Sequence, residues 1–124
     1  MKYMEPIQEI DPAIGAHGMW KAHLRDAIEN GTSEFQPNVV ATDNNCAFGK
    51  WLHGDISPEL KNSKTYPTIV QYHATFHKEA AKILQLALIG EKDEAEKKMS
   101  ALSEFAAISS SLTSTMVEWK KSLE

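Results

Sequence analysis

The chain has 124 residues, of which 13 are Lys or Arg and 17 are Asp or Glu, giving a formal net charge of -4. This is the size of an ordinary domain that can bury a core without disulfides or a structural metal, so we expect one domain over residues 1–124. Mild acidity and the absence of a long basic block argue against nucleic acid as a partner.

Cysteine usage and hydropathy indicate the kind of environment that suits the chain. Cys46 is the only cysteine, so the chain cannot form an internal disulfide. No basic-then-apolar leader opens the sequence, and the longest strongly apolar stretch, 83–89, is much shorter than the roughly 20 residues of a membrane span. We therefore expect a soluble, cytoplasmic protein with no membrane partner.

The first quarter of the sequence has the periodicity of a helix. Apolar residues recur at gaps of three, four or seven from Ile7 to Ile28, and His17 lies on the same stripe. Asp11 followed by Pro12 has the chemistry of an N-cap and a first helical residue, although the stripe begins earlier. Gly31 is a suitable end for this helix.

A loop and a short helix are expected next. Residues 31–45 mix turn formers with two valines and keep no period, which predicts a loop. Asp43 or Asn44 can cap a short helix that contains Cys46, and Gly54 would end it. A second loop then extends to the next periodic segment.

Two more amphipathic helices complete the chain, one from Pro67 to near Gly90 and one from about Glu91 to the end. The apolar face of the first carries Ile69, Val70, His73, Phe76, His77, Ala80, Leu84 and Ala87. The stripe of the second carries Ala95, Met99, Leu102, Ala106, Leu112, Met116, Trp119 and Leu123.

These elements define the predicted fold class. No segment alternates apolar and polar residues as a strand would, and three long helices and one short helix can bury their stripes only against each other. We expect an all-α protein, similar to a four-helix bundle, with an additional short helix that carries the cysteine.

His73 and His77 are the strongest chemical signal in the sequence. They are four residues apart on an apolar face, so both imidazoles can be directed at one ion if the segment is helical. Two buried imidazoles without partners would each cost on the order of 1–3 kcal/mol, so another group should satisfy them. With His17 on a facing stripe and Cys46 at a helix start, the pattern predicts a site of one cysteine and three histidines for one zinc ion per chain.

Each donor also has a simpler interpretation. A single histidine on an apolar stripe, such as His17, is more often a core residue with one hydrogen bond. Cys46 alone would be a small buried hydrophobe, although a helix N-terminus would favour its thiolate form and prepare it for metal. We expect His23 to face solvent, because it points about 120° away from His17 on a helix. His53 is expected to interact with the helix end beside Gly54.

The motifs around these residues match a known pattern. The segments are His17-Gly-Met-Trp20, Cys46-Ala-Phe48-Gly49-Lys-Trp51-Leu52 and His73-Ala-Thr-Phe76-His77. In order and spacing they resemble the chemoreceptor zinc-binding (CZB) domain over roughly residues 14–120. The resemblance implies zinc held by His17, Cys46, His73 and His77, with Trp20, Phe48, Gly49, Trp51 and Phe76 packed around the metal or allowing close helix approach.

The same resemblance implies a sensory role. Such domains are bacterial cytoplasmic modules that tend to form homodimers and are attached to chemoreceptor segments or diguanylate cyclases. No output domain is present in these 124 residues, so we expect an excised module or a free-standing member that acts on a receptor or cyclase in cis or in trans.

The predicted ligand set favours sensing over catalysis. Four protein ligands leave no open coordination position, so we expect a sensor and no enzyme. Since the ligands come from three helices, loss of zinc or of the Cys46 ligand would change helix packing. A zinc-bound thiolate is also a target for oxidants such as hypochlorous acid, which the resemblance supports.

Four alternatives to a zinc sensor make different demands on the sequence. A zinc hydrolase of the His-Glu-x-x-His type needs glutamate where the chain has Ala74. A di-iron site of the hemerythrin kind needs more ligands, and a phosphotransfer bundle needs an exposed histidine with a following glycine pattern. A dimerisation module whose histidines pack without metal is the remaining alternative, and metal analysis separates it from the zinc site.

Overall fold

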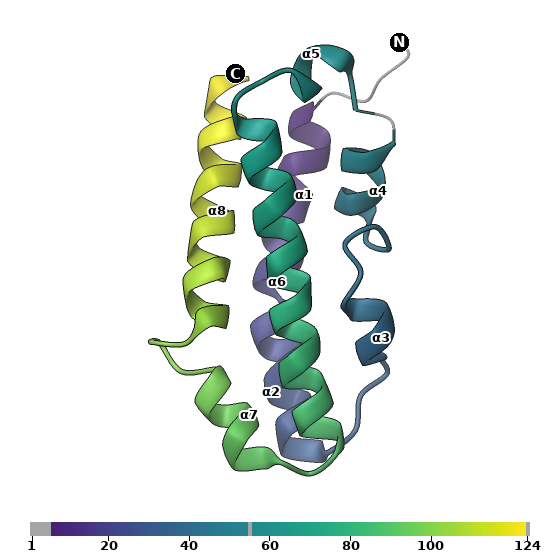
Figure 1. The fold of residues 1–124 in the computed structure, drawn as a ribbon, viewed down its shortest axis with the longest axis vertical. Coiled ribbons are helices and arrows are strands. Elements are labelled where there is room, and N and C mark those ends of the chain that lie inside the picture. The colour runs from purple at the N-terminus through teal and green to yellow at the C-terminus, as the bar shows by residue number, and fades with distance from the viewer. Residues whose placement is uncertain (1–5, 55, 124) are drawn as a thin grey trace.

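The computed structural model describes residues 6–54 and 56–123, and every regular element in these ranges is a helix (Figure 1). The expected 1–124 domain also includes residues 1–5, 55 and 124, which lie outside the described residues. The predicted all-α class is confirmed. The elements are α1 Pro6–Gly18, α2 Trp20–Asn30, α3 Pro37–Val40, α4 Ala47–His53, α5 Pro58–Lys61, α6 Thr65–Leu88, α7 Lys92–Lys98 and α8 Glu104–Ser122.

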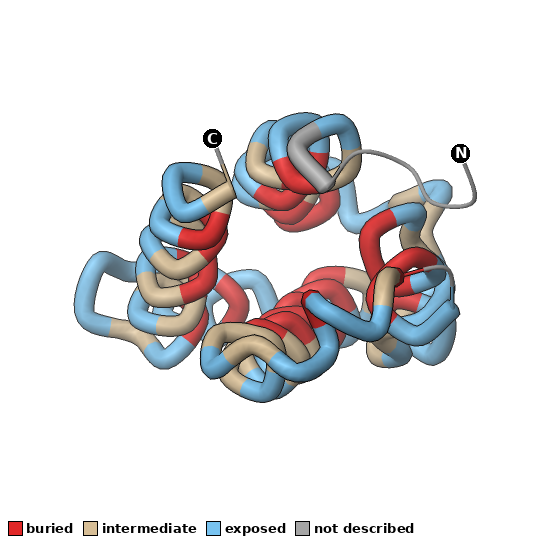
Figure 2. The backbone as a smooth tube through the Cα atoms, turned by 90° about the horizontal axis from the view of Figure 1, so that it is seen from above, coloured by how far each residue is buried: buried red, intermediate tan, exposed pale blue. Residues whose placement is uncertain are grey.

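Four walls surround the core. Helices α1 and α2 follow one another in one wall, α6 and α8 form two more, and α3 and α4 stack in the fourth (Figure 1). Helix α6 contacts α2, α3, α7 and α8, while α1 contacts α4 and α8. Figure 2 shows that the buried residues of each wall face the centre. The arrangement is therefore a bundle in which short helices, including the predicted one after Cys46, replace one long helix.

The predicted first helix is divided at Met19. The division is slight, because Met19 keeps a right-handed helical backbone and its N–H donates to the Gly15 carbonyl at 3.0 Å. The N-cap prediction at Asp11–Pro12 is wrong, since α1 begins at Pro6 and Pro12 lies inside it. The inward direction expected for the Ile7 side chain lies outside what the structure describes.

Glycines end two helices as the sequence predicts. Gly31 has φ +71°, a left-handed conformation that favours glycine, and its N–H donates to the Ala27 carbonyl at 2.8 Å. Gly54 ends α4, with its N–H donating to the Trp51 carbonyl at 3.2 Å.

Both predicted loops contain a helical turn, which corrects the prediction. Helix α3 begins at Pro37 and α5 at Pro58, because proline is pre-set for the first helical position. The Ser57 hydroxyl also accepts a hydrogen bond from the Leu60 N–H at 3.4 Å. Four-residue helices are too short to create a hydrophobic period, so the sequence pattern misses them.

The predicted last helix is also interrupted, between α7 and α8. The N–H and the hydroxyl of Ser103 both donate to the Ser100 carbonyl, and the hydroxyl accepts from the Ala106 N–H at 3.1 Å. This local bonding competes with a continuous helix and caps α8 instead. Leu102, which the sequence places on the apolar stripe, lies in this turn and is 99% exposed, so that prediction is wrong.

Helix α6 is the central element and matches its predicted span closely. Of its predicted apolar face, only Val70 is not fully buried. None of the helices described by the structure has both the length and the apolar character needed to cross a membrane.

Candidate metal centre

The four predicted ligands lie together inside the bundle. His17 comes from α1, Cys46 is the residue before α4, and His73 and His77 lie one turn apart on α6. One donor atom from each residue lies within 4.8 Å of the others, and all three imidazoles are buried. Three segments that are distant in sequence therefore direct one sulfur and three nitrogens to one point.

The distances between these atoms fit a small tetrahedral ion. The Nε2 atom of His73 lies 3.0 Å from those of His17 and His77. The Cys46 Sγ atom lies 3.3, 3.6 and 4.0 Å from the Nε2 atoms of His73, His77 and His17. A tetrahedron with ordinary zinc–nitrogen and zinc–sulfur bonds has edges of about 3.3 Å between nitrogens and about 3.6 Å between nitrogen and sulfur. The cluster is thus compatible with zinc, the ion that this mixed donor set favours.

Backbone carbonyls orient two of the rings. The Nδ1 atom of His17 lies 2.8 Å from the Ala13 carbonyl oxygen, and that of His77 lies 2.9 Å from the Val40 carbonyl oxygen. A carbonyl only accepts, so each Nδ1 carries the proton and donates it. The Nε2 atoms of both rings are left with free lone pairs, which is the tautomer that a metal ligand needs.

Protons alone do not satisfy the close contacts in the cluster. The Nε2 lone pairs of His17 and His77 both approach His73 Nε2, and one proton on that atom can be directed at only one of them. A thiol proton on Cys46 can serve one further contact. The buried Nδ1 atom of His73 has no hydrogen-bond partner among the described residues, so this ring is held by its Nε2 side. A shared cation would satisfy all four donor atoms together.

Burial keeps the three imidazoles neutral. It lowers the pKa of His17 from 6.5 to about 4 and that of His73 to about 2, and it also lowers the pKa of His77. The hydrogen bonds to Ala13 and Val40 oppose this effect without reversing it. Neutral imidazole is the form that binds a metal, so the site does not have to lose protons from its histidines at neutral pH.

Cys46 differs from the sequence-based expectation. It is itself the N-cap of α4, in place of Asp43 or Asn44, and its Sγ accepts from the Gly49 N–H at 3.3 Å. This bond lowers the pKa of the thiol, but burial raises it more, so the net pKa is raised. The helix start alone therefore does not produce a thiolate, and a positive charge at the cluster is needed to stabilise one.

Aromatic rings form the wall of the cluster. Phe48 lies edge-on to His17 and His73, with ring centroids 5.9 and 5.2 Å apart, and Phe76 lies 5.3 Å from His17. Trp51 stacks behind Phe48 and contacts Trp119. This wall holds the imidazoles in fixed orientations and limits access of water.

Two other motif residues have separate roles. A Cβ atom on Gly49 would lie 1.7 Å from the Asp43 carbonyl oxygen, so only glycine allows α4 to approach the preceding loop. Trp20 does not pack around the cluster as the resemblance implies. It contacts His23 and Phe35 instead.

The two remaining histidines lie outside the cluster. His23 is half-buried between Trp20 and Phe35, so the expectation that it faces solvent is only partly correct. His53 is exposed at the end of α4, where its Nε2 lies 3.0 Å from the Asp43 carboxylate. Its role is to connect the last turn of α4 with the loop before that helix.

A small cavity leads to the cluster from the surface between α1 and α4. It has a volume of about 120 Å³ and is lined by residues that include Pro12, Ala16, His17 and Cys46. Cys46 is accordingly only half-buried, although the three imidazoles are buried. Cys46 is therefore the least buried of the four candidate ligands.

The comparisons with known proteins agree with this geometry. A family model described as the chemoreceptor zinc-binding domain matches residues 17–84, which include all four donors. The chain belongs to this family. The chemoreceptor zinc-binding domain is a sensory, regulatory family, which is not a catalytic one. Searches of curated proteins and of solved structures found no match.

The sequence does not predict the two carbonyl oxygens that orient the rings. The partner of His17 could have been found, because Ala13 precedes it by four residues and lies one helical turn below. The partner of His77 could not, since Val40 belongs to a short helix in a segment predicted as a loop.

Proposed function

We propose that this chain is a zinc-dependent sensory domain in which His17, Cys46, His73 and His77 hold one zinc ion. The observation that carries the proposal is the convergence of three Nε2 atoms and one Sγ atom at tetrahedral spacing. Bound there, zinc would cross-link three helices and stabilise the thiolate of Cys46. Because all four donors come from the protein, the site favours a regulatory role over catalysis.

The position of the ligands supports a conformational output. Cys46 precedes α4, whereas His73 and His77 belong to the central helix α6. Helix α3 is also connected to the site, because His77 donates a hydrogen bond to the Val40 carbonyl. Release of Cys46 would loosen α4 against α6, while His17 and the α6 histidines keep their places in the core and the His77 hydrogen bond still holds α3.

Oxidant sensing is the second part of the proposal. Cys46 is the donor that a small oxidant can reach through the cavity beside α1. Its thiolate would react with hypochlorous acid to give a sulfenic acid and chloride, and the sulfur would no longer be a strong metal ligand. The three imidazoles would remain and keep weaker affinity for the ion.

The family suggests the biological context of this sensor. We propose that residues 1–124 act as one cytoplasmic domain, as a homodimer, coupled to a chemoreceptor or cyclase output in cis or in trans. A metal-free or di-iron interaction module is the alternative.

Elemental analysis combined with native mass spectrometry tests the zinc site. We expect one zinc ion per chain in the wild type, much weaker binding in His73→Ala and weakened binding in Cys46→Ser. His23→Ala is the matched control, because that histidine lies outside the cluster, and it should keep full zinc content. Iron in place of zinc, or equal zinc content in wild type and His73→Ala, would refute the proposal.

The oxidant response is tested on the same proteins. After treatment with stoichiometric hypochlorous acid, the wild type should release zinc to a chromogenic chelator more rapidly than the untreated wild type does. Cys46→Ser should show no oxidant-dependent release. An unchanged response in Cys46→Ser would reject the redox part of the proposal and leave zinc binding untouched.

A further inference from the structure

A groove with an apolar floor lies on the outer side of α6, beside α3. It has a volume of about 660 Å³, is open to solvent and is bordered by α3 on one side and by the end of α7 on the other. Its α6 residues, Lys78, Ala81, Lys82, Gln85 and Leu86, are spaced as one helical stripe. The small Ala41 and Ala81 side chains in the lining leave room for another chain to approach α6 closely.

Among the described residues, the groove is lined by three lysines, Lys78, Lys82 and Lys98, and by no acidic residue. Lys82 is held by Glu79 at 2.9 Å, and Lys98 acts on the same carboxylate at longer range. Lys78 forms no ion pair among the described residues. This local positive charge contrasts with the net charge of -4 of the whole chain. An apolar floor with a basic border is complementary to an apolar surface bordered by carboxylates.

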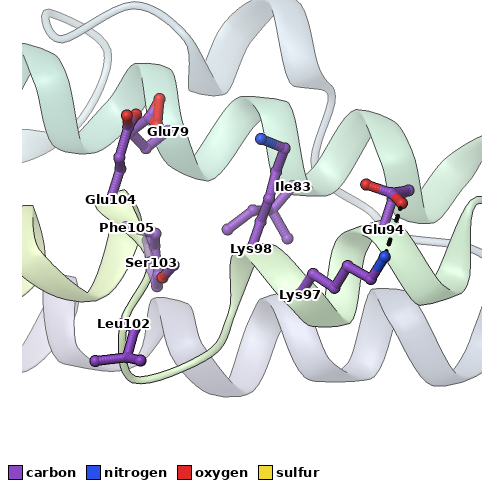
Figure 3. Close-up of a pocket in the computed structure, with 9 residues that line it drawn as sticks. All are labelled: Glu79, Ile83, Glu94, Lys97, Lys98, Leu102, Ser103, Glu104 and Phe105. Carbon is purple, nitrogen blue, oxygen red and sulfur yellow. Dashed lines mark hydrogen bonds and ion pairs between the residues drawn. The ribbon is translucent and has the colours of Figure 1, made fainter.

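Lys98, the last residue of α7, lines the groove and also a neighbouring pocket between α6, α7 and α8, which Figure 3 shows. In that pocket its side chain extends across towards α6, while Leu102 points away into the turn after α7. Lys98 lines both hollows, so it forms the border between them. The neighbouring pocket contains Glu79 and Glu104, and the groove is therefore the only one of these two hollows suited to an acidic partner.

We propose that this groove docks an amphipathic helix of a signalling partner, with an apolar face against Ala81 and Leu86 and acidic residues against Lys78 and Lys98. The groove follows one stripe of α6 between α3 and the end of α7. A helix-in-groove contact uses apolar residues at the same three- and four-residue spacing. A small anionic ligand would not need cations on both sides of an open groove.

The metal centre and the groove share α3. Pro37 and Ala41 line the groove, and the intervening Val40 accepts the hydrogen bond from His77. Zinc binding fixes the orientation of His77, so it also fixes the position of the groove's α3 side. This coupling rests on the proposed zinc site and makes partner affinity depend on metal occupancy.

The docking test uses a fluorescein-labelled 18-residue helical peptide with leucines at i, i+3, i+4 and i+7 and glutamates beside them. Its counterpart has lysine in place of every glutamate. Fluorescence anisotropy with the zinc-loaded chain should show at least tenfold tighter binding of the acidic peptide, with an affinity that falls as salt is raised. No binding, or equal binding of the two peptides, overturns the proposal.

Charge reversal locates the binding site. Lys78→Glu combined with Lys98→Glu should weaken binding of the acidic peptide at least tenfold, and Lys21→Glu, on the exposed side of α2, should leave it unchanged. All three lysines are exposed, so these variants should fold, which circular dichroism checks. An equal loss of peptide affinity in the Lys21 control overturns the assignment of the binding site to the groove. A change of sedimentation coefficient in the double variant also overturns it, because it would identify a second copy of the chain as the occupant.

The coupling is tested by chelation. The zinc-free chain should bind the acidic peptide at least fivefold more weakly than the zinc-loaded chain. Equal affinity overturns the coupling, whereas absence of zinc from the purified protein, measured by elemental analysis, would refute the proposed function and leave the docking result standing.

Discussion

The half of the bundle that contains α1 and α4 buries three imidazoles beside a half-buried thiol. The half that contains α2, α7 and the C-terminal part of α6 buries mostly apolar side chains, and its one buried carboxylate among the described residues, Glu79, is paired with Lys82. In the second half, the buried residues of α2 and α7 are only Ala, Leu and Ile. Apolar burial is independent of pH and of metal, but buried imidazoles are stable only when neutral and satisfied. The half that contains the imidazoles can therefore respond to pH and to metal, because apolar packing in the other half keeps the protein folded.

Removal of zinc should produce the largest difference in stability between the two halves. At a free zinc concentration about 1,000 times the dissociation constant, the ion contributes about 4 kcal/mol to the free energy of unfolding, which chelation removes. Hydrogen exchange should increase mainly in α3 and α4, while α2 and the C-terminal part of α6 stay protected. A uniform increase along the chain would contradict the division into two halves.

A cavity in the apolar half should be independent of zinc. Leu84 is 1% exposed, so Leu84→Ala should lower the free energy of unfolding by about 2–5 kcal/mol, by the same amount in zinc-loaded and zinc-free protein. Denaturant unfolding measures both values. The matched control is Leu102→Ala, at a 99% exposed leucine, which should change stability by less than about 0.5 kcal/mol.

Acid should destabilise the zinc-free protein through the imidazoles. The pKa of His17 is about 4 in the folded chain, against an ordinary value of 6.5, so the unfolded state binds more protons between these pH values. The contribution of neutral His17 to the free energy of unfolding is therefore fully present above pH 6.5. It falls by on the order of 3 kcal/mol as the pH is lowered towards 4. Urea unfolding at several pH values should show a weaker slope in His17→Gln, and an unchanged slope would contradict this assignment.

The smallest predicted effect concerns the contact between α4 and the preceding loop. Gly49→Ala places a Cβ against the Asp43 carbonyl, so we expect the free energy of unfolding to fall by about 1–3 kcal/mol and zinc binding to weaken. In the control Gly15→Ala the new Cβ meets nothing within 4 Å, and the free energy of unfolding should rise by about 0.4–1 kcal/mol. Thermal unfolding and zinc titration of both variants measure these effects. Normal zinc affinity in Gly49→Ala would show that the close approach is not needed by the site.

Part of the candidate site follows directly from the sequence. His73 and His77 share a face of α6 because four residues complete about one helical turn, and the apolar stripe directs that face inward. The motif around Cys46 also indicates a helix start, although it does not show that the sulfur itself is the cap. The orientation of His77 by Val40 depends on a contact between residues 37 positions apart, so no local pattern contains it.

Periodicity and residue chemistry are local properties, and they were enough to define the helical class, the long central helix and the identity of the candidate donors. The meeting of His17, Cys46 and the α6 pair came from the tertiary structure, since convergence depends on how separate segments pack. The same is true of the balance at Cys46, where the helix start lowers the pKa of the thiol and burial raises it more. Burial is a property of the assembled bundle, which explains why the local pattern alone suggested the opposite result.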